Sequence, residues 1–178
     1  MTEATPSDGL FIIHTGDGKG KTTAALGLVV RAWGQGKSVK MFQFLKNTGA
    51  RFGEHRAAER LGISIESRGD GFTWLSKDMD ETTAIAVDQW ARCKVAIQAG
   101  DTDVIVLDEA TYPVTYGWLD TDDVVSTIAN RPPHVHIVVT GREAHEKLNE
   151  IADVVTEMED VKHPYRDQGI KAQPGLDF

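Results

Sequence analysis

Residues 15–23, with the sequence TGDGKGKTT, are of the types that bind phosphate. Glycines allow a tight turn that aims backbone N–H groups inward, Lys21 supplies a mobile cation, and the Thr22 hydroxyl is a suitable ligand for Mg²⁺. An apolar strand at 10–14 precedes the run and a helical segment at 24–33 follows it. This setting favours a phosphate-binding P-loop. The general pattern has glycine where this chain has Thr15, and a glycine-rich turn before a helix is the alternative.

An acidic pair, Asp108 and Glu109, follows four apolar residues at 104–107. A pair at such a strand end is typical of a Walker B element, whose carboxylates hold Mg²⁺ directly or through water while the metal bridges phosphate oxygens. Together with Thr22, these residues form the candidate metal site. Capping of the following helix is the alternative role.

Polar segments also follow two other apolar runs, at 46–54 and at 140–142. Ligands of open parallel sheets bind at the carboxyl ends of the strands, so we expect these segments to meet the P-loop at one crevice. Arg142 suits bidentate phosphate binding, although a surface role fits it nearly as well. The candidate nucleotide-binding residues are Gly16, Asp17, Gly18, Lys19, Gly20, Lys21, Thr22, Thr23, Arg51, Glu54 and Arg142.

Two large aromatic residues, Phe72 and Trp74, lie in a glycine-flanked segment at 68–74 that follows neither a helix nor a strand period. Exposed aromatic rings on a loop indicate contact with a large, flat, apolar ligand. The alternative is that both rings pin the loop to the core, as most large aromatic side chains do.

Strand and helix signals alternate along the chain. Apolar runs rich in β-branched residues lie at 10–14, 39–45, 104–107, 135–139 and 154–155, and they are apolar on both faces, as parallel strands between helical layers are. Helices are expected from the P-loop to Gly34 or Gly36, at 81–99, and more weakly at 53–61, 122–129 and 144–151. The pattern predicts one α/β domain over residues 1–178, a three-layer P-loop NTPase-like fold with a mostly parallel central sheet. We expect residues 1–9 to be flexible and the tail at 162–178 to be irregular.

The composition excludes several classes of protein. The formal net charge of -8 argues against non-specific nucleic-acid binding, which depends on lysine and arginine. No run reaches the roughly 20 apolar residues that span a bilayer, and the first nine residues show no apolar signal segment, so we expect a cytoplasmic protein with no membrane partner. The single cysteine, Cys93, falls on an apolar helix face and is expected in the core.

Several spaced motifs occur in a fixed order along the chain: residues 15–25, 42–46 with 53–54, 71–74, 106–109, 140–142 and 162–165, followed by Gly169, 171–173 and 175–178. Together they resemble the P-loop type of ATP:cob(I)alamin (corrinoid) adenosyltransferase, and the resemblance runs nearly the whole chain. Asp17 stands where asparagine or glutamate is also common in this family. Many members carry a longer helical extension before the first strand.

The resemblance implies a reaction, its cofactor and its partners. ATP would bind by its triphosphate on residues 18–23 with Mg²⁺ near Thr22, and Lys21, Thr22 and Glu109 would be the catalytic residues. A corrinoid (cobalamin, cobinamide or a cobyrinic acid diamide) would lie beneath Phe72 and Trp74. Its Co(I) centre would attack C5′ of ATP, giving the adenosylated corrinoid and triphosphate. A flavoprotein reductant and a homodimer are also implied.

Two other classes of function remain open from the residues. A P-loop small-molecule kinase would share the loop and the metal carboxylate, but it usually needs a base for the acceptor hydroxyl and an arginine-bearing lid. An ATP-gated corrinoid-binding module would bind both ligands without turnover. Assaying the product that forms from ATP and reduced cobalamin discriminates among the three.

Overall fold

The computed structural model describes residues 8–47, 49, 51–69 and 79–177. Its centre is a six-stranded sheet in the order β3-β2-β4-β5-β1-β6, and every strand pairing is parallel. The strands are β1 (Phe11–Thr15), β2 (Val39–Gln43), β3 (Ser64–Ser67), β4 (Val104–Asp108), β5 (His136–Thr140) and β6 (Val154–Glu157). The helices are α1 (Lys21–Gly34), α2 (Gly53–Leu61), α3 (Met79–Ala99), α4 (Thr111–Thr115), α5 (Thr121–Ala129), α6 (Glu146–Ile151) and α7 (Pro164–Gln168).

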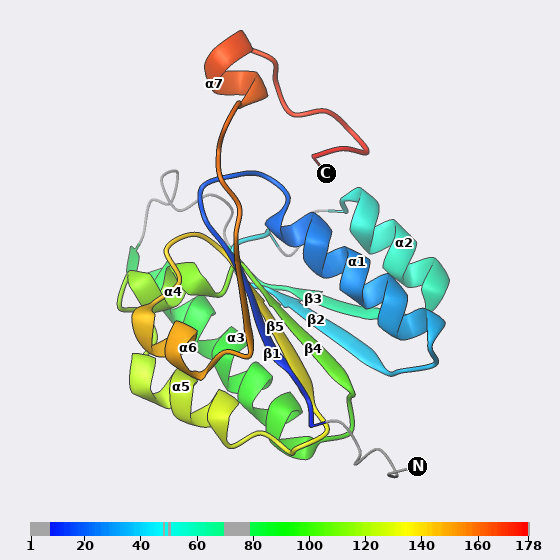
Figure 1. Ribbon diagram of the computed structural model, residues 1–178, viewed down its shortest axis with the longest axis vertical. Coiled ribbons are helices and arrows are strands. Elements are labelled where there is room, and N and C mark those ends of the chain that lie inside the picture. The colour runs from blue at the N-terminus through cyan, green and yellow to red at the C-terminus, as the bar shows by residue number, and fades with distance from the viewer. Residues whose placement is uncertain (1–7, 48, 50, 70–78, 178) are drawn as a thin grey trace, which may run out of the picture.

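Helices cover both faces of the sheet (Figure 1), with α1 and α2 on one face and α3, α5 and α6 on the other. Each face has its own apolar core. Phe11 and Ile13 of β1 belong to the core that also contains Trp90, whereas Met41 and Val106 belong to the core beneath α1. Because alternate residues of a strand point to opposite faces, strands covered on both sides must be apolar throughout. The α/β, three-layer expectation is confirmed.

Two edges of the sheet differ from the expectation. β3 was not expected, because three of the four residues in its sequence SIES are polar, as its place at the edge of the sheet allows. β6 was expected to be buried but is exposed along its whole length, since it forms the opposite edge and pairs only with β1. The run at 39–45 stops being strand after Gln43, and the expected helix at 144–151 begins at Glu146.

The tail contains one short helix that the sequence did not indicate. α7 starts with Pro164, is capped by the His163 side chain, which accepts from the Arg166 N–H, and ends at Gly169 with φ 67°. The chain then returns to the P-loop, where Asp177 pairs with Lys19 (Figure 1). At the other end of the chain, residues 1–7 lie outside the described part, while Gly9 is anchored by Pro133 and Arg131. The expected flexibility of residues 1–9 falls mostly on residues outside the described part and stays a prediction, while Gly9 itself is hydrogen-bonded.

Two further expectations concern Cys93 and the membrane. Cys93 is fully buried and its thiol pKa is raised well above its usual value by burial, as a core residue requires. Within the described ranges, no helix has both the length and the apolarity to cross a bilayer.

Candidate functional site

Lys21 is the first residue of α1, and its side chain folds back over the preceding loop. Its Nζ donates hydrogen bonds to the carbonyl oxygens of Gly16 and Gly18, both at 2.7 Å. Gly16 and Gly20 have positive φ angles of 90° and 112°, which favour glycine and give the loop its tight turns. Burial, and then the charge of Arg142, lower the pKa of Lys21. The strand, loop and helix of a P-loop are thus in place, with the cation held over the turn.

The loop glycines also pack against the chain that leaves β6. A Cβ on Gly16 would lie 2.5 Å from the carbonyl oxygen of Met158, and one on Gly18 would lie 2.5 Å from that of Glu159. The Gly18 N–H donates to the Met158 carbonyl at 2.7 Å, so this N–H is already engaged by the protein. Thr15, in place of the usual first glycine, is buried and accepts a hydrogen bond from the Ala144 N–H at 3.1 Å. The departure at Thr15 therefore ties the loop to the segment after β5.

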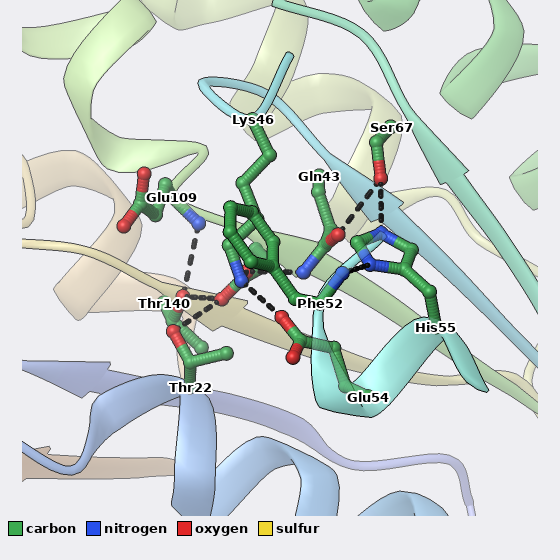
Figure 2. Close-up of polar contacts among 10 residues, drawn as sticks. Thr22, Gln43, Lys46, Phe52, Glu54, His55, Ser67, Glu109 and Thr140 are labelled. Carbon is green, nitrogen blue, oxygen red and sulfur yellow. Dashed lines mark hydrogen bonds and ion pairs between the residues drawn. The ribbon is translucent and has the colours of Figure 1, made fainter. Parts of the chain in front are cut away.

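Asp108 is completely buried and joins four elements of the site. Its Oδ1 accepts hydrogen bonds from the hydroxyls of Thr22 at 2.8 Å and Thr140 at 2.7 Å, and its Oδ2 accepts from Nε2 of Gln43 at 3.0 Å. Figure 2 shows Thr22, Thr140 and Gln43 reaching this point from α1, β5 and β2. Capping of the next helix is not what the Asp108 side chain does: the residue at the N-cap of α4 is Ala110.

Glu109 has a strained backbone and an unusual carboxyl group. Its φ of 59° is uncommon for any residue except glycine, and its N–H donates to the Thr140 hydroxyl at 2.9 Å. Burial, followed by repulsion from Asp108, raises the pKa of Glu109 to about 7. Non-glycine residues in such conformations persist where surrounding contacts hold them, often at functional sites.

The oxygen atoms near Thr22 are of the kind that Mg²⁺ prefers. The Thr22 hydroxyl donates a hydrogen bond to Asp108, which leaves its oxygen lone pairs available to a metal, and Glu109 carries the other carboxylate that the sequence predicts for the metal site. Among the described residues, no group of three or more histidine, cysteine, aspartate or glutamate side chains is arranged to hold a metal by itself. A magnesium ion would therefore depend on phosphate oxygens for its remaining ligands, as in a nucleotide complex.

Lys46 begins the segment at 46–54 that was expected at the crevice, but it was not itself among the candidate nucleotide-binding residues. Its Nζ pairs with Glu54 at 2.5 Å and lies 3.9 Å from Oδ2 of Asp108 (Figure 2). Burial is the largest single influence on Glu54 and would raise its pKa, but the hydrogen bond from Lys46, a backbone hydrogen bond and the charge of Lys46 together lower the pKa. Arg51, in contrast, pairs with Glu59 and two thirds of its side chain is exposed. The position of Lys46, directly after the apolar run at 39–45, is the sequence feature that could have identified it as a site residue.

Arg142 and Lys19 have acidic partners near the loop. Nε of Arg142 lies 3.7 Å from Asp17, and both border an open pocket of about 520 Å³ beside the chain that follows β6. Lys19 pairs with Asp177 of the tail at 2.6 Å. The exposed Thr23 side chain lies on the first turn of α1. Phe72 and Trp74 lie outside the described residues, so their predicted corrinoid contact stays a prediction.

Comparison with known proteins identifies the family. The family model described as ATP:corrinoid adenosyltransferase BtuR/CobO/CobP matches residues 7–178. The corrinoid adenosyltransferase CobA of Salmonella typhimurium is 39% identical over 178 residues, covering all of this chain and 90% of that protein. The corrinoid adenosyltransferases of Escherichia coli K12 and Pseudomonas aeruginosa are each 38% identical and also cover the whole chain, over 90% and 88% of their own lengths.

Among solved structures, the flagellar accessory protein FlaH from Methanocaldococcus jannaschii aligns with a TM-score of 0.54 at 13% identity. The alignment covers 85% of this chain and 71% of FlaH, and it supports the fold alone. The family match, in contrast, spans the P-loop, the strand that ends in Asp108 and the tail that returns to Lys19. The chain belongs to the ATP:corrinoid adenosyltransferase family BtuR/CobO/CobP.

Proposed function

We propose that this protein transfers the 5′-deoxyadenosyl group of ATP to the Co(I) centre of a corrinoid, releasing triphosphate. The observation that carries the proposal is the match of residues 7–178 to the adenosyltransferase family, joined to a P-loop whose Thr22 is hydrogen-bonded to a buried Asp108. The match supports the reaction, and the loop supports ATP as the donor.

The P-loop would bind the triphosphate through its remaining backbone N–H groups, Lys21 and Lys19. Phosphate oxygens would compete with the Gly16 and Gly18 carbonyls for the Lys21 ammonium group, which lies 2.7 Å from each. Arg142 would add charge at the open side of the loop once it leaves Asp17. These cations would stabilise the charge on the leaving triphosphate.

Thr22 and Glu109 would hold Mg²⁺, and Asp108 would fix the Thr22 hydroxyl from behind. Mg²⁺ bound there would neutralise part of the negative charge of the triphosphate. Asp108 has no exposed surface and both of its oxygens accept protein hydrogen bonds, so we assign it an indirect role. Because the pKa of Glu109 is about 7, its carboxyl group is part-protonated near neutrality and would lose that proton on binding a cation.

The chemical step forms a cobalt–carbon bond and breaks the bond between C5′ and the triphosphate oxygen. Both bonding electrons of the new bond come from the Co(I) substrate, and the electrons of the broken bond leave with the triphosphate. No proton moves, so the step needs no general base. We therefore propose that Glu109 acts on the metal and does not activate a nucleophile.

Phe72 and Trp74 are the proposed corrinoid-binding residues. If they displace the lower axial ligand of Co(II), the double change to alanine will reduce adenosylation from Co(II)alamin plus reductant far more than adenosylation from preformed Co(I)alamin. Equal losses with both cobalt states would point to packing and contradict this role.

We further propose that a flavoprotein reductant delivers the electron to Co(II), that the protein acts as a homodimer, and that it works in the cytoplasm. These proposals rest on the resemblance and on the sequence composition. The corrinoid precursor and the reductase remain open to direct assay with purified candidates.

Incubation of the protein with ATP, Mg²⁺ and chemically reduced cobalamin tests the proposed reaction. We expect adenosylcobalamin and free triphosphate in equal amounts. ADP with a phosphorylated acceptor would indicate a kinase, and ATP binding without turnover would indicate a binding module. Arg142 and Arg166 border one pocket, but they pair with Asp17 and Asp160 and so do not form the arginine-bearing lid of a kinase. Among the residues that the structure describes, no feature favours the kinase.

A further inference from the structure

A chain of hydrogen bonds with a single direction runs from the first turn of α2 to Asp108 (Figure 2). The Phe52 N–H donates to Nδ1 of His55 at 3.0 Å, so Nδ1 carries no proton and Nε2 carries it. Nε2 lies 2.9 Å from the Ser67 hydroxyl oxygen and donates to it. Ser67 donates to Oε1 of Gln43 at 2.8 Å, and Nε2 of Gln43 donates to Oδ2 of Asp108 at 3.0 Å. Each hydrogen bond thus fixes the orientation of the donor group in the next one.

This chain of hydrogen bonds fixes the orientation of the Gln43 amide. Gln43 is fully buried, and a flipped amide would place its oxygen against the Asp108 carboxylate. The Ser67 hydroxyl prevents the flip, because it offers its proton where the amide oxygen must be. It can do so because His55 occupies its acceptor side. Burial lowers the pKa of His55, which favours the neutral ring that this arrangement needs.

The two oxygens of Asp108 have different partners. Oδ1 accepts from Thr22 and Thr140, on the P-loop side. Oδ2 accepts from Gln43 and lies 3.9 Å from Lys46, which is itself paired with Glu54. The first turn of α2 therefore reaches Oδ2 twice, through His55 and through Glu54. Fixing Oδ2 also fixes the plane of the carboxylate, and with it the acceptor that holds the Thr22 hydroxyl.

We propose that His55 is a positioning residue for Asp108, acting through Ser67 and Gln43. The inference rests on the proposed function, in which Thr22 and Glu109 hold the metal of the nucleotide complex. When these hydrogen bonds are lost, the Gln43 amide and the Asp108 carboxylate can rotate, and the Thr22 hydroxyl loses its fixed orientation. The metal–nucleotide complex then binds more weakly, while the corrinoid side of the site is unaffected.

The competing role for His55 is structural, because its Nδ1 also caps α2. His55→Asn separates the two roles, since the asparagine oxygen takes the place of Nδ1 and nothing takes the place of Nε2–H. Ser67→Ala removes the next link without touching the cap. Ser64→Ala is the matched control, because Ser64 lies on the same strand but is exposed and outside the chain of hydrogen bonds.

The probe is Mn²⁺ with ATP, whose binding is followed by electron paramagnetic resonance of free Mn²⁺ without any turnover. We expect His55→Asn and Ser67→Ala each to weaken Mn²⁺ binding about three- to tenfold, and Ser64→Ala to leave it unchanged. The double variant should lose no more than either single variant, because both act through one path. The KM for the corrinoid and the urea midpoint should stay at wild-type values.

Additive losses, an unchanged Mn²⁺ affinity in Ser67→Ala, or a lowered urea midpoint that parallels the loss of affinity would each overturn the proposal. Nitrogen-15 NMR of the imidazole supplies an independent check, because the proposal requires the Nε2–H tautomer and an Nδ1–H tautomer contradicts it. The adenosylation assay on the wild-type protein is separate. A wild-type protein that binds Mn²⁺ with ATP but forms no adenosylcobalamin contradicts the proposed function and leaves the positioning role standing.

Discussion

At the scale of single residues, the Lys21 ammonium group is the cation most directly aimed at the loop. We expect Lys21→Ala to reduce adenosylation at least about a hundredfold, because a charge-assisted contact to the leaving triphosphate is lost. The measurement is the initial rate of adenosylcobalamin formation, with circular dichroism to check the fold. Lys37→Ala, an exposed lysine after α1, is the control and should retain its rate. A folded Lys21→Ala protein with the wild-type rate would remove the P-loop from the mechanism.

The raised pKa of Glu109 predicts a pH-dependent stability. The pKa rises from its usual 4.5 to about 7, so the folded protein binds the proton more tightly than the unfolded chain does. The stability that this proton gives is present below pH 4.5 and is lost as the pH rises to about 7. Without nucleotide or Mg²⁺, Glu109→Gln should therefore be more stable than wild type at pH 8, by about 1–3 kcal/mol, and nearly equal to it at pH 4.5.

Urea denaturation at the two pH values measures this difference for Glu109→Gln. The control is Glu150→Gln, an exposed glutamate at the end of α6, which should follow the wild-type curve at both values. Parallel stability curves for Glu109→Gln and wild type would show that burial does not raise this pKa.

The sequence could predict the residues of the site that stand in local motifs, but not those that distant segments contribute. Lys21, Thr22 and Asp108 were predicted because loop and strand end each have a recognisable pattern. Gln43 is 65 residues from the aspartate it holds, and its role depends on the alignment of β2 with β4. Lys46 likewise needed the structure, because its pairing with Glu54 and its approach to Asp108 depend on how α2 packs.

At the scale of elements, the loop after β5 is shaped by a contact with α4. Gly141 has φ 143°, and a Cβ there would lie 1.9 Å from the Thr111 hydroxyl oxygen. That hydroxyl donates to the Arg142 carbonyl at 2.6 Å. We expect Gly141→Ala to lower the free energy of unfolding by at least about 2 kcal/mol, through both the clash and the backbone strain. Urea denaturation measures it.

Gly27→Ala is the matched control for Gly141→Ala. Gly27 lies within α1 and has open space around its Cβ position, so alanine should raise the free energy of unfolding by about 0.5–1 kcal/mol. The same glycine-to-alanine substitution would then change the free energy of unfolding in opposite directions, because the Cβ position is open at Gly27 and occupied by Thr111 at Gly141. A Gly141→Ala protein as stable as wild type would contradict the close packing of the loop on α4.

Elements with strong periodicity were predicted well, and short elements were not. α3 was expected at 81–99 and begins two residues earlier, at Met79. α4 and α7 have five residues each, too few for a helical period to appear in the sequence. β6 was predicted as a strand, but its exposure follows from its place in the strand order, which apolar runs alone do not specify.

At the scale of the whole molecule, the two ends of the described chain lie at opposite ends of the strands (Figure 1), and the tail reaches the P-loop. The Asp177 side chain is 14% exposed and pairs with Lys19 at 2.6 Å. We expect Asp177→Asn to tighten ATP binding by up to about fivefold, because an ion pair near the surface is worth about 1 kcal/mol at most and ATP must displace it. Isothermal titration calorimetry measures the change.

Asp101→Asn, an exposed aspartate between α3 and β4, provides the same change of charge away from the loop and should leave ATP binding as it is. Weaker ATP binding in Asp177→Asn would mean that Asp177 contributes to the nucleotide site instead of competing for Lys19.

The backbone of Met158, in the segment that leaves β6, is bonded to the P-loop and to the strand before it, because its N–H donates to the Thr15 carbonyl and its carbonyl accepts from the Gly18 N–H. An amide proton exchanges with deuterated water only when its hydrogen bond opens. The amides of Gly18 and Met158 lie 140 positions apart in the chain, yet they are released by one separation of these two segments. Peptides that contain Gly18 and Met158 will therefore gain deuterium together, and their common rate will measure how often the nucleotide loop separates from the segment that leaves β6.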